Sequence, residues 1–145
     1  MSRSRLLVCG FALAALGLSS GCGAKDPSSL HITNLRVEEP DPGQPPDLLF
    51  AVDNGLSVSD SLISIASPDA ESLTVGGTGA PVALPAREAT RFEPGATYAR
   101  LNRPRRQLEV GDEVQVTFTF GSGIQIRLRT PVVEPGATGP DAGHR

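Results

Sequence analysis

The chain has very few of the side chains that most often bind metals or carry out catalysis. Its 145 residues include no tryptophan, one tyrosine, one methionine, two histidines and two cysteines. The cysteines are Cys9 and Cys22, and Cys9 lies within an apolar N-terminal run that has the character of an export leader. Removal of that leader leaves one cysteine, so an internal disulfide is excluded and any bridge would have to join two chains.

Basic residues are also too few for a nucleic-acid-binding protein. The chain carries 13 lysines and arginines against 16 acidic residues, a net charge of −3. Loss of Arg3 and Arg5 with the leader leaves 11 basic residues against the same 16, a net charge of −5. A protein that binds the phosphates of a polyanion needs the opposite balance, so nucleic acid is not an expected partner.

Residues 1–21 have the layout of an export leader, and Cys22 follows directly. Two arginines precede an almost wholly apolar run, Leu6 to Leu18, which is shorter than the roughly 20 residues that a membrane-spanning helix needs. The stretch Leu18-Ser19-Ser20-Gly21-Cys22 resembles the bacterial lipobox, although its leucine lies one place early. The resemblance implies a diacylglyceryl group on Cys22, residues 22–30 as lipidated cysteine and tether, and an extracytoplasmic, membrane-anchored domain. Simple secretion or a periplasmic location is the alternative.

The rest of the composition favours strands. Glycine and proline number 16 and 13, while aromatic residues make up 4% of the chain, which favours many short elements joined by turns. From His31 on, alternating segments are broken by turn formers about every 8 to 12 residues, a spacing typical of an all-β sandwich. We therefore expect residues 31–133 to form one such domain.

The two clearest predicted strands form a hairpin near the end of this domain. On either side of the Gly121-Ser122-Gly123 loop, seven apolar residues alternate with polar ones: Val114, Val116, Phe118, Phe120, Ile124, Ile126 and Leu128. A period of two places each set on one face, so all seven are expected to face the core. Further strands are predicted over residues 32–37, 48–52, 62–66, 72–75, 81–84, 89–92 and 97–101.

Two segments are expected to lie outside the strands. Four prolines between residues 39 and 46 remove backbone donors and fix φ, so this segment is predicted to be a loop. From Pro131 onward the chain has few large apolar side chains to bury, and residues 134–145 are predicted to form a disordered tail.

A series of short landmarks carries a family resemblance from about Asp47 to Val133. They are Leu49 to Gly55 with its Asn-Gly end, Asp60-Ser61-Leu62 with the turn at residues 66–70, Val82 to Ala86 with Pro-Ala, Glu93-Pro94-Gly95, and Leu108 to Asp112 with Leu-x-x-Gly-Asp. In order and spacing they resemble the periplasmic copper chaperone family PCu(A)C. The resemblance implies a cupredoxin- or immunoglobulin-like β-sandwich of about seven to nine short strands.

Proteins of that family hold Cu(I) with two histidines and nearby methionines, and these residue types are missing at the corresponding positions here. The first histidine would fall near Gly76, the methionine-bearing loop is shortened around Gly77-Thr78-Gly79, and the final His-x-Met position reads Tyr98-Ala99-Arg100. The only methionine is Met1, although thioether sulfur suits Cu(I) best. His31 is interpreted as a strand-edge polar residue and His144 as a solvated tail residue. The chain thus resembles a degenerate member, and no copper or other cofactor is expected.

The densest charged feature lies where the family would place the rim of its metal site. It comprises the arginines Arg100, Arg103, Arg105 and Arg106, with Tyr98 beside them as an aromatic surface. Together they could bind phosphate or carboxylate groups of an envelope polymer, a lipid head group or a partner protein. The alternative is an ordinary solvated loop whose arginines balance Glu109, Asp112 and Glu113, with Tyr98 as half-buried packing.

No enzymatic activity is predicted. No serine of the mature chain lies in a Gly-x-Ser-x-Gly context, and Gly76 to Gly79 lacks the Lys-Ser/Thr end of a phosphate-binding loop. The sequence therefore favours an envelope-anchored lipoprotein whose copper-chaperone-like domain has lost its metal site and acts as a non-catalytic binding or accessory module. Its expected partners are the membrane, through the lipid, and an envelope protein or anionic envelope component. The alternative is an extracytoplasmic copper chaperone with unconventional ligands.

Overall fold

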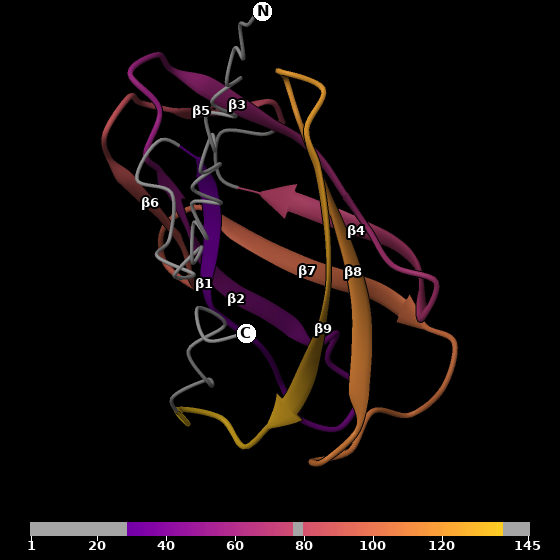
Figure 1. Ribbon diagram of the computed structural model, residues 1–145. Coiled ribbons are helices and arrows are strands. Elements are labelled where there is room, and N and C mark those ends of the chain that lie inside the picture. Colours follow the sequence, from indigo (N-terminus) through magenta and orange to yellow (C-terminus); the bar gives the residue numbers. More distant parts are fainter. Residues whose placement is uncertain (1–28, 77–79, 138–145) are drawn as a thin grey trace, which may run out of the picture.

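The computed structural model describes residues 29–76 and 80–137, and every regular element within these ranges is a strand (Figure 1). Each of the nine sequence segments predicted to be extended overlaps one of them, which confirms the all-β class. The strands are β1 (Leu30–Glu38), β2 (Asp47–Asn54), β3 (Asp60–Ala66), β4 (Ala70–Gly76), β5 (Val82–Leu84), β6 (Ala89–Phe92), β7 (Tyr98–Pro104), β8 (Glu113–Phe120) and β9 (Gln125–Val133).

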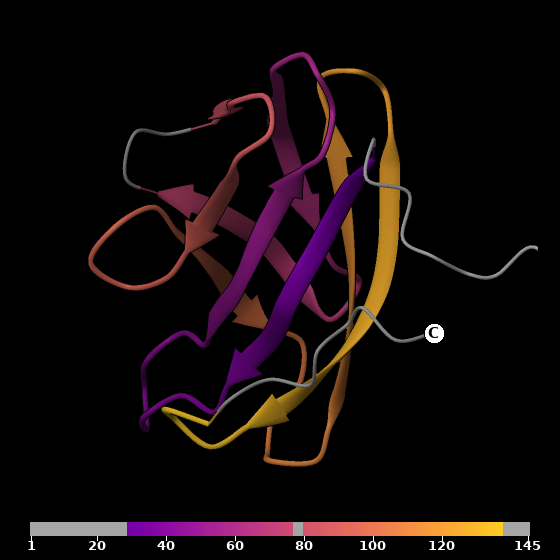
Figure 2. The same ribbon diagram turned by 60° about the vertical axis from the view of Figure 1, so that its left-hand side comes forward.

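The strands form one curled sheet in the order β4-β7-β2-β1-β9-β8-β3-β5, with β6 paired to β2. The curl brings β3, β8 and β9 to face β1, β2 and β7, so the sheet closes into two layers (Figures 1 and 2). The layers join where β1 and β9 run parallel, through Val37 with Val132 and Glu38 with Val133, whereas the other strand pairs are antiparallel. The predicted sandwich is therefore confirmed, with its layers continuous at one edge.

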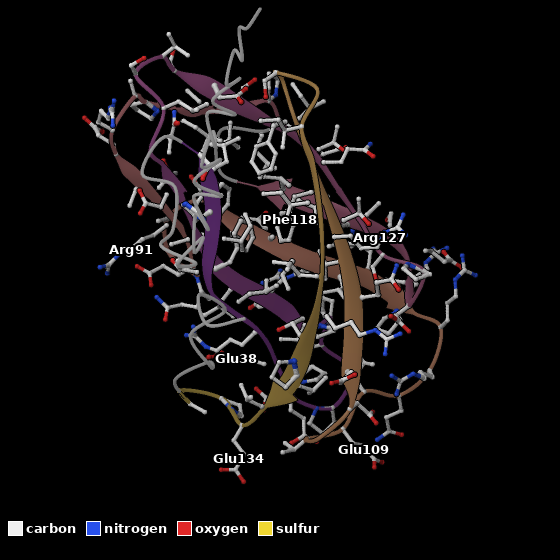
Figure 3. The ribbon with its side chains drawn as sticks, viewed as in Figure 1. Glu38, Arg91, Glu109, Phe118, Arg127 and Glu134 are labelled. Atoms are coloured by element: carbon white, nitrogen blue, oxygen red, sulfur yellow. The ribbon has the colours of Figure 1, made fainter. Side chains whose placement is uncertain are left out.

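The core lies between these layers and is tied together by three phenylalanines. The rings of Phe50 and Phe92 are stacked with centroids 4.3 Å apart, and Phe118 meets Phe50 edge-on at 5.0 Å. Phe50 and Phe92 belong to one layer, while Phe118, labelled in Figure 3, comes from β8 in the other. Aromatic contacts of this geometry stabilise a core beyond the area that they bury.

The predicted β8–β9 hairpin is present, but not all of its apolar residues are buried. Val114, Val116, Phe118 and Phe120 are fully buried, as the alternation predicts. The three apolar residues of the second arm differ: Ile126 and Leu128 are only half-buried, and Ile124 is exposed. The prediction for Ile124 is wrong because this residue lies at the hairpin tip, before the ladder begins at Gln125 opposite Thr119.

Asn54, the last residue of β2, is fully buried and fixes the turn that follows it. Its Nδ2 lies within hydrogen-bond distance of three carbonyl oxygens, those of Leu84 (2.9 Å), Val58 (3.1 Å) and Pro85 (3.2 Å). Its Oδ1 accepts the N–H of Leu56 at 3.0 Å. One amide therefore joins the β2–β3 loop to the end of β5.

The first strand begins slightly before the predicted start of the domain, and the last strand ends at the predicted bound, Val133. Leu30 already belongs to β1 and is buried, so the strand begins one residue before His31. Residues 131–133 are part of β9, where Val132 is buried and its N–H donates to the Asp112 carbonyl at 2.8 Å. The loop over residues 39–46 is confirmed. The leader, Cys22, residues 77–79 and residues 138–145 lie outside the described residues. In the described part of the chain, no helix is long and apolar enough to cross a membrane.

Candidate functional site

The positions at which the family resemblance places copper ligands lie side by side on β4 and β7. Gly76 is directly opposite Tyr98 in the register of these strands. The Tyr98 ring covers Gly76 so closely that a Cβ atom on residue 76 would overlap the ring carbons. The ring therefore occupies the space that any side chain at position 76 would need, and glycine is what allows it to lie there.

This contact predicts a strong coupling between the two residues. Gly76→Ala is expected to lower the free energy of unfolding by about 1–3 kcal/mol, because the added methyl group forces the ring out of its place. In a Tyr98→Ala background the same substitution should cost little, since the space is then open. Chemical unfolding of the wild type, both single variants and the double variant measures the coupling. Equal costs in the two backgrounds would contradict the contact.

Arg100 lies two residues along β7 from Tyr98 and is held by an acidic partner. Its Nε donates to Asp47 Oδ1 at 2.7 Å, and its Cζ lies 5.3 Å from the centroid of the Tyr98 ring. The hydrogen bond to Asp47 raises the pKa of the Arg100 guanidinium above its ordinary value. The guanidinium is thus held in its protonated form near an aromatic ring, and in this form it has no lone pair to offer a metal ion.

Polar side chains continue this face of β4 and β7. Asn102 Nδ2 donates to Thr74 Oγ1 and, at 3.4 Å, to Ser72 Oγ. The other face of β7 carries Ala99 and Leu101, both buried in the core. The outer face is therefore a hydrogen-bonding surface with oxygen and nitrogen donors and no sulfur.

The four arginines do not share one loop, although their closeness in the sequence predicted that they would. That prediction is wrong because β7 continues to Pro104, so Arg100 and Arg103 belong to a strand and only Arg105 and Arg106 to the loop at residues 105–112. Arg103 adopts a φ of 48° and its Nη1 lies 3.2 Å from Glu71 Oε2, yet its side chain is 82% exposed. Tyr98 and Arg100 are brought together, whereas the other three arginines have separate partners.

Arg105 and Arg106 point to different neighbours. Arg105 Nε donates to the Pro68 carbonyl at 3.1 Å, and among the described residues it forms no ion pair within 4.0 Å. Arg106 Nη1 donates to Asp112 Oδ2 at 2.7 Å and its Nη2 to the Glu113 carbonyl at 3.1 Å. The pKa of Asp112 is lowered mainly by the hydrogen bond from the N–H of Glu109, and Arg106 lowers it further. Of the predicted balancing acids, Asp112 pairs with Arg106, while Glu113 lies 3.7 Å from Arg129 instead.

Sequence reasoning missed a pocket that opens beside this loop. It has a volume of about 920 Å³ and is formed by three segments distant in sequence: the proline-rich β1–β2 loop, the β7–β8 loop and the chain just after β9. Its lining includes Pro40, Pro42, Pro46, Pro104, Pro135 and Arg106. The run of prolines was the available signal, but only the assembled fold shows that these loops meet.

The described residues at the family position, Gly76, Tyr98 and Arg100, do not bring soft metal donors together. Gly76 offers no side chain, the Tyr98 phenol is a hard oxygen donor, and Arg100 is a cation, so this set does not fit Cu(I). His31 lies on β1 opposite Asp53. Asp53 is six residues along β2 from Asp47, the partner of Arg100, so His31 lies about 20 Å along the strands from the Arg100 end of the family position. Its Nε2 is 2.8 Å from Ser29 Oγ. Over residues 29–76 and 80–137, no three His, Cys, Asp or Glu side chains form a group that could hold a metal ion.

Solved structures identify the class of this fold. The copper-bound PCuAC domain from PmoF2 is 21% identical with a TM-score of 0.67, covering 74% of this chain and 94% of that one. The apo PCuAC domain from PmoF1 is also 21% identical, with a TM-score of 0.69 and coverages of 74% and 95%. Cu(I)-bound DR1885 from Deinococcus radiodurans is 18% identical with a TM-score of 0.62, over 82% and 85%. The chain therefore has the PCuAC, cupredoxin-like fold.

Residues 30–132 match the model of the family described as "Putative lipoprotein LpqE-like", and the chain belongs to that family. The match spans β1 to the buried Val132, which is nearly the whole of the folded domain. No curated protein matches the chain.

Proposed function

We propose that this chain is an extracytoplasmic lipoprotein, anchored through Cys22, whose PCuAC-like domain is a non-catalytic binding or accessory module without copper at the family site. The anchor is supported by the export leader that ends at Cys22 and by the lipoprotein description of the matching family. No serine of the mature sequence lies in a Gly-x-Ser-x-Gly context, which supports a non-catalytic role.

The observation that carries the proposal is the arrangement of Gly76, Tyr98 and Arg100. An aromatic ring fills the space above Gly76, and an ion-paired guanidinium lies 5.3 Å from its centroid. A cuprous site needs soft neutral donors that converge on one point. The guanidinium that Asp47 holds there has no lone pair to donate to a metal ion.

Titration of the reduced mature protein with Cu(I) against a competing chelator tests the loss of the metal site. We expect no binding with a dissociation constant below about 1 μM, because a tighter site would have to draw on the scattered His31 and His144. The alternative function, a copper chaperone with unconventional ligands, predicts sub-micromolar affinity that is lost in His31→Ala. That result would contradict the proposal.

For the binding surface we propose Tyr98 and the four arginines from Arg100 to Arg106, together with the region from Gly76 to Ala80. Arg103 is largely exposed, and Arg105 has no ion pair with a described carboxylate, so both guanidinium groups remain open to an external anion. Guanidinium groups bind carboxylate and phosphate through paired, charge-assisted hydrogen bonds. The expected partner is an acidic surface of an envelope protein or an anionic envelope component.

Crosslinking in native envelopes, followed by identification of the attached molecules, tests this surface. The Arg103→Ala/Arg105→Ala/Arg106→Ala variant should lose captures that the wild type makes. A matched control, Arg91→Ala/Arg127→Ala/Arg129→Ala, removes the same charge from β6 and β9 and should keep them. Identical captures from the wild type and the first variant would exclude the arginines as the binding surface.

A further inference from the structure

Large apolar side chains are exposed mainly at one end of the domain. In the described part of the chain, four such residues are exposed: Val58 (64%), Ile63 (43%), Val110 (49%) and Ile124 (42%). Val58 lies in the β2–β3 loop, Ile63 in β3 and Ile124 at the β8–β9 hairpin tip, and these segments meet at the upper end of the molecule in Figure 1. We call Val58, Ile63 and Ile124 the apolar tip. Val110 lies at the opposite end, in the loop between β7 and β8.

Specific contacts join the loops of the apolar tip. Asp60 accepts the N–H of Ser122 at 3.0 Å and its hydroxyl at 2.6 Å, which fastens the start of β3 to the hairpin loop. Burial opposes ionisation of Asp60, but hydrogen bonds from Ser122 and the N–H of Ser61 outweigh it and lower the pKa. A Cβ on Gly121 would lie 3.7 Å from Ile63 Cδ1. Val58, Asp60 and Ser122 also line one shallow pocket.

The chain from the lipid-bearing end enters the fold beside the apolar tip. Leu30, the first residue of β1, pairs with Asn54, and the carbonyl of Ser29 accepts the N–H of Gly55 at 3.0 Å. Asn54 in turn bonds the carbonyl of Val58 at 3.1 Å. The β2–β3 loop that carries Val58 therefore lies next to the point where the N-terminal segment attaches.

The length of that segment restricts which end of the domain can face a bilayer. Seven residue steps separate Cys22 from Ser29, at most about 25 Å of extended chain. The nine residues of β1 alone span about 30 Å. If the opposite end of the domain faced the bilayer, Ser29 would lie at least the length of β1 above the membrane surface. The segment from Cys22 to Ser29 is too short to span that distance.

We propose that the apolar tip docks onto the bilayer surface beside the Cys22 anchor, with Val58, Ile63 and Ile124 inserted at the boundary between head groups and acyl chains. The inference rests on the proposed function, because it requires the lipid on Cys22. A short tether raises the local concentration of the tip at the membrane, so a few aliphatic side chains suffice for contact. The proline-lined pocket and the arginines of the β7–β8 loop then face away from the membrane, open to a partner.

The test uses mature lipidated protein purified from cells that express the full chain, reconstituted into phosphatidylcholine vesicles that contain a lipid with a nitroxide near its head group. Val58→Cys, Ile63→Cys and Ile124→Cys carry a fluorescent label, with Val110→Cys as the exposed aliphatic control. In each protein the introduced cysteine is the single free thiol, because Cys9 leaves with the leader and Cys22 is acylated. Quenching is expected to be several-fold stronger at the three tip positions than at position 110.

A second arm changes the tip without relying on a label within it. With the label at position 63, Val58→Asp/Ile124→Asp should reduce quenching to the control level, whereas Val110→Asp should leave it unchanged. All three substituted side chains are exposed, and circular dichroism confirms the fold of each variant. Equal quenching at all four label positions in lipidated protein would overturn the docking. It would also be overturned if, in the absence of vesicles, the tip were buried against a second copy of the chain. Mass spectrometry of the N-terminal fragment tests the anchor separately, and a fragment without lipid would overturn the anchor and the docking together.

Discussion

Introducing family-type donors is expected to create a copper site: a Gly76→His/Tyr98→His/Arg100→Met variant should bind Cu(I) at least about 100-fold more tightly than the wild type. The strand register already places residue 76 opposite residue 98, with residue 100 on the same face of β7. The substitutions supply two imidazoles and a thioether, and they remove both the ring that covers position 76 and the guanidinium, which has no lone pair to donate to a metal ion. Competition with a chromophoric Cu(I) chelator under reducing conditions measures the change.

The control for this experiment is Gly76→Ala/Tyr98→Ala/Arg100→Ala, which opens the same space without adding donors. We expect its Cu(I) affinity to stay at the wild-type level. A gain in this variant would mean that ligands elsewhere bind the ion once Arg100 is gone. If instead the donor-bearing variant binds no better than the wild type, the assignment of these positions to the family site is wrong.

Replacing Asn54 by alanine is expected to produce the largest loss of stability from a single polar side chain. The substitution leaves the carbonyls of Val58, Leu84 and Pro85 and the N–H of Leu56 without the amide that they contact. Buried groups left without partners cost more than the net value of the bonds that satisfied them. We expect a loss of about 2–3 kcal/mol and a fall in Tm of about 10–20 °C, measured by thermal unfolding.

The matched control is Asn102→Ala, since among the described residues the Asn102 side chain hydrogen-bonds only to Ser72 and Thr74, on the exposed face of β4. Its loss should change stability by no more than about 0.5 kcal/mol. Similar small changes in both variants would show that Asn54 does not hold the β2–β3 loop to β5.

The alternation of apolar and polar residues predicted the strands well, because the period of two is a local property of an extended chain. It misjudged Ile124 because alternation assigns a face, while burial also depends on what covers that face. It ended β7 too early, at Leu101, because polar residues and a proline follow. Pairing with β4 extends that strand through Asn102 opposite Ser72 to Pro104 opposite Ala70. This pairing places Arg100 and Arg103 in a strand and leaves Arg105 and Arg106 in the loop that follows.

The sequence by itself determined which chemistry is available: no methionine beyond Met1, two histidines far apart, a cluster of arginines, and strands set by local alternation. Only the tertiary structure decided which of these side chains meet. Asp47 holds Arg100 across 53 residues, Tyr98 covers Gly76, three distant segments form one pocket, and the loop that carries the exposed Val58 lies beside the start of β1. The alternation of side chains along a strand is set by neighbouring residues. The tertiary contacts depend instead on pairing between strands that are far apart in the chain.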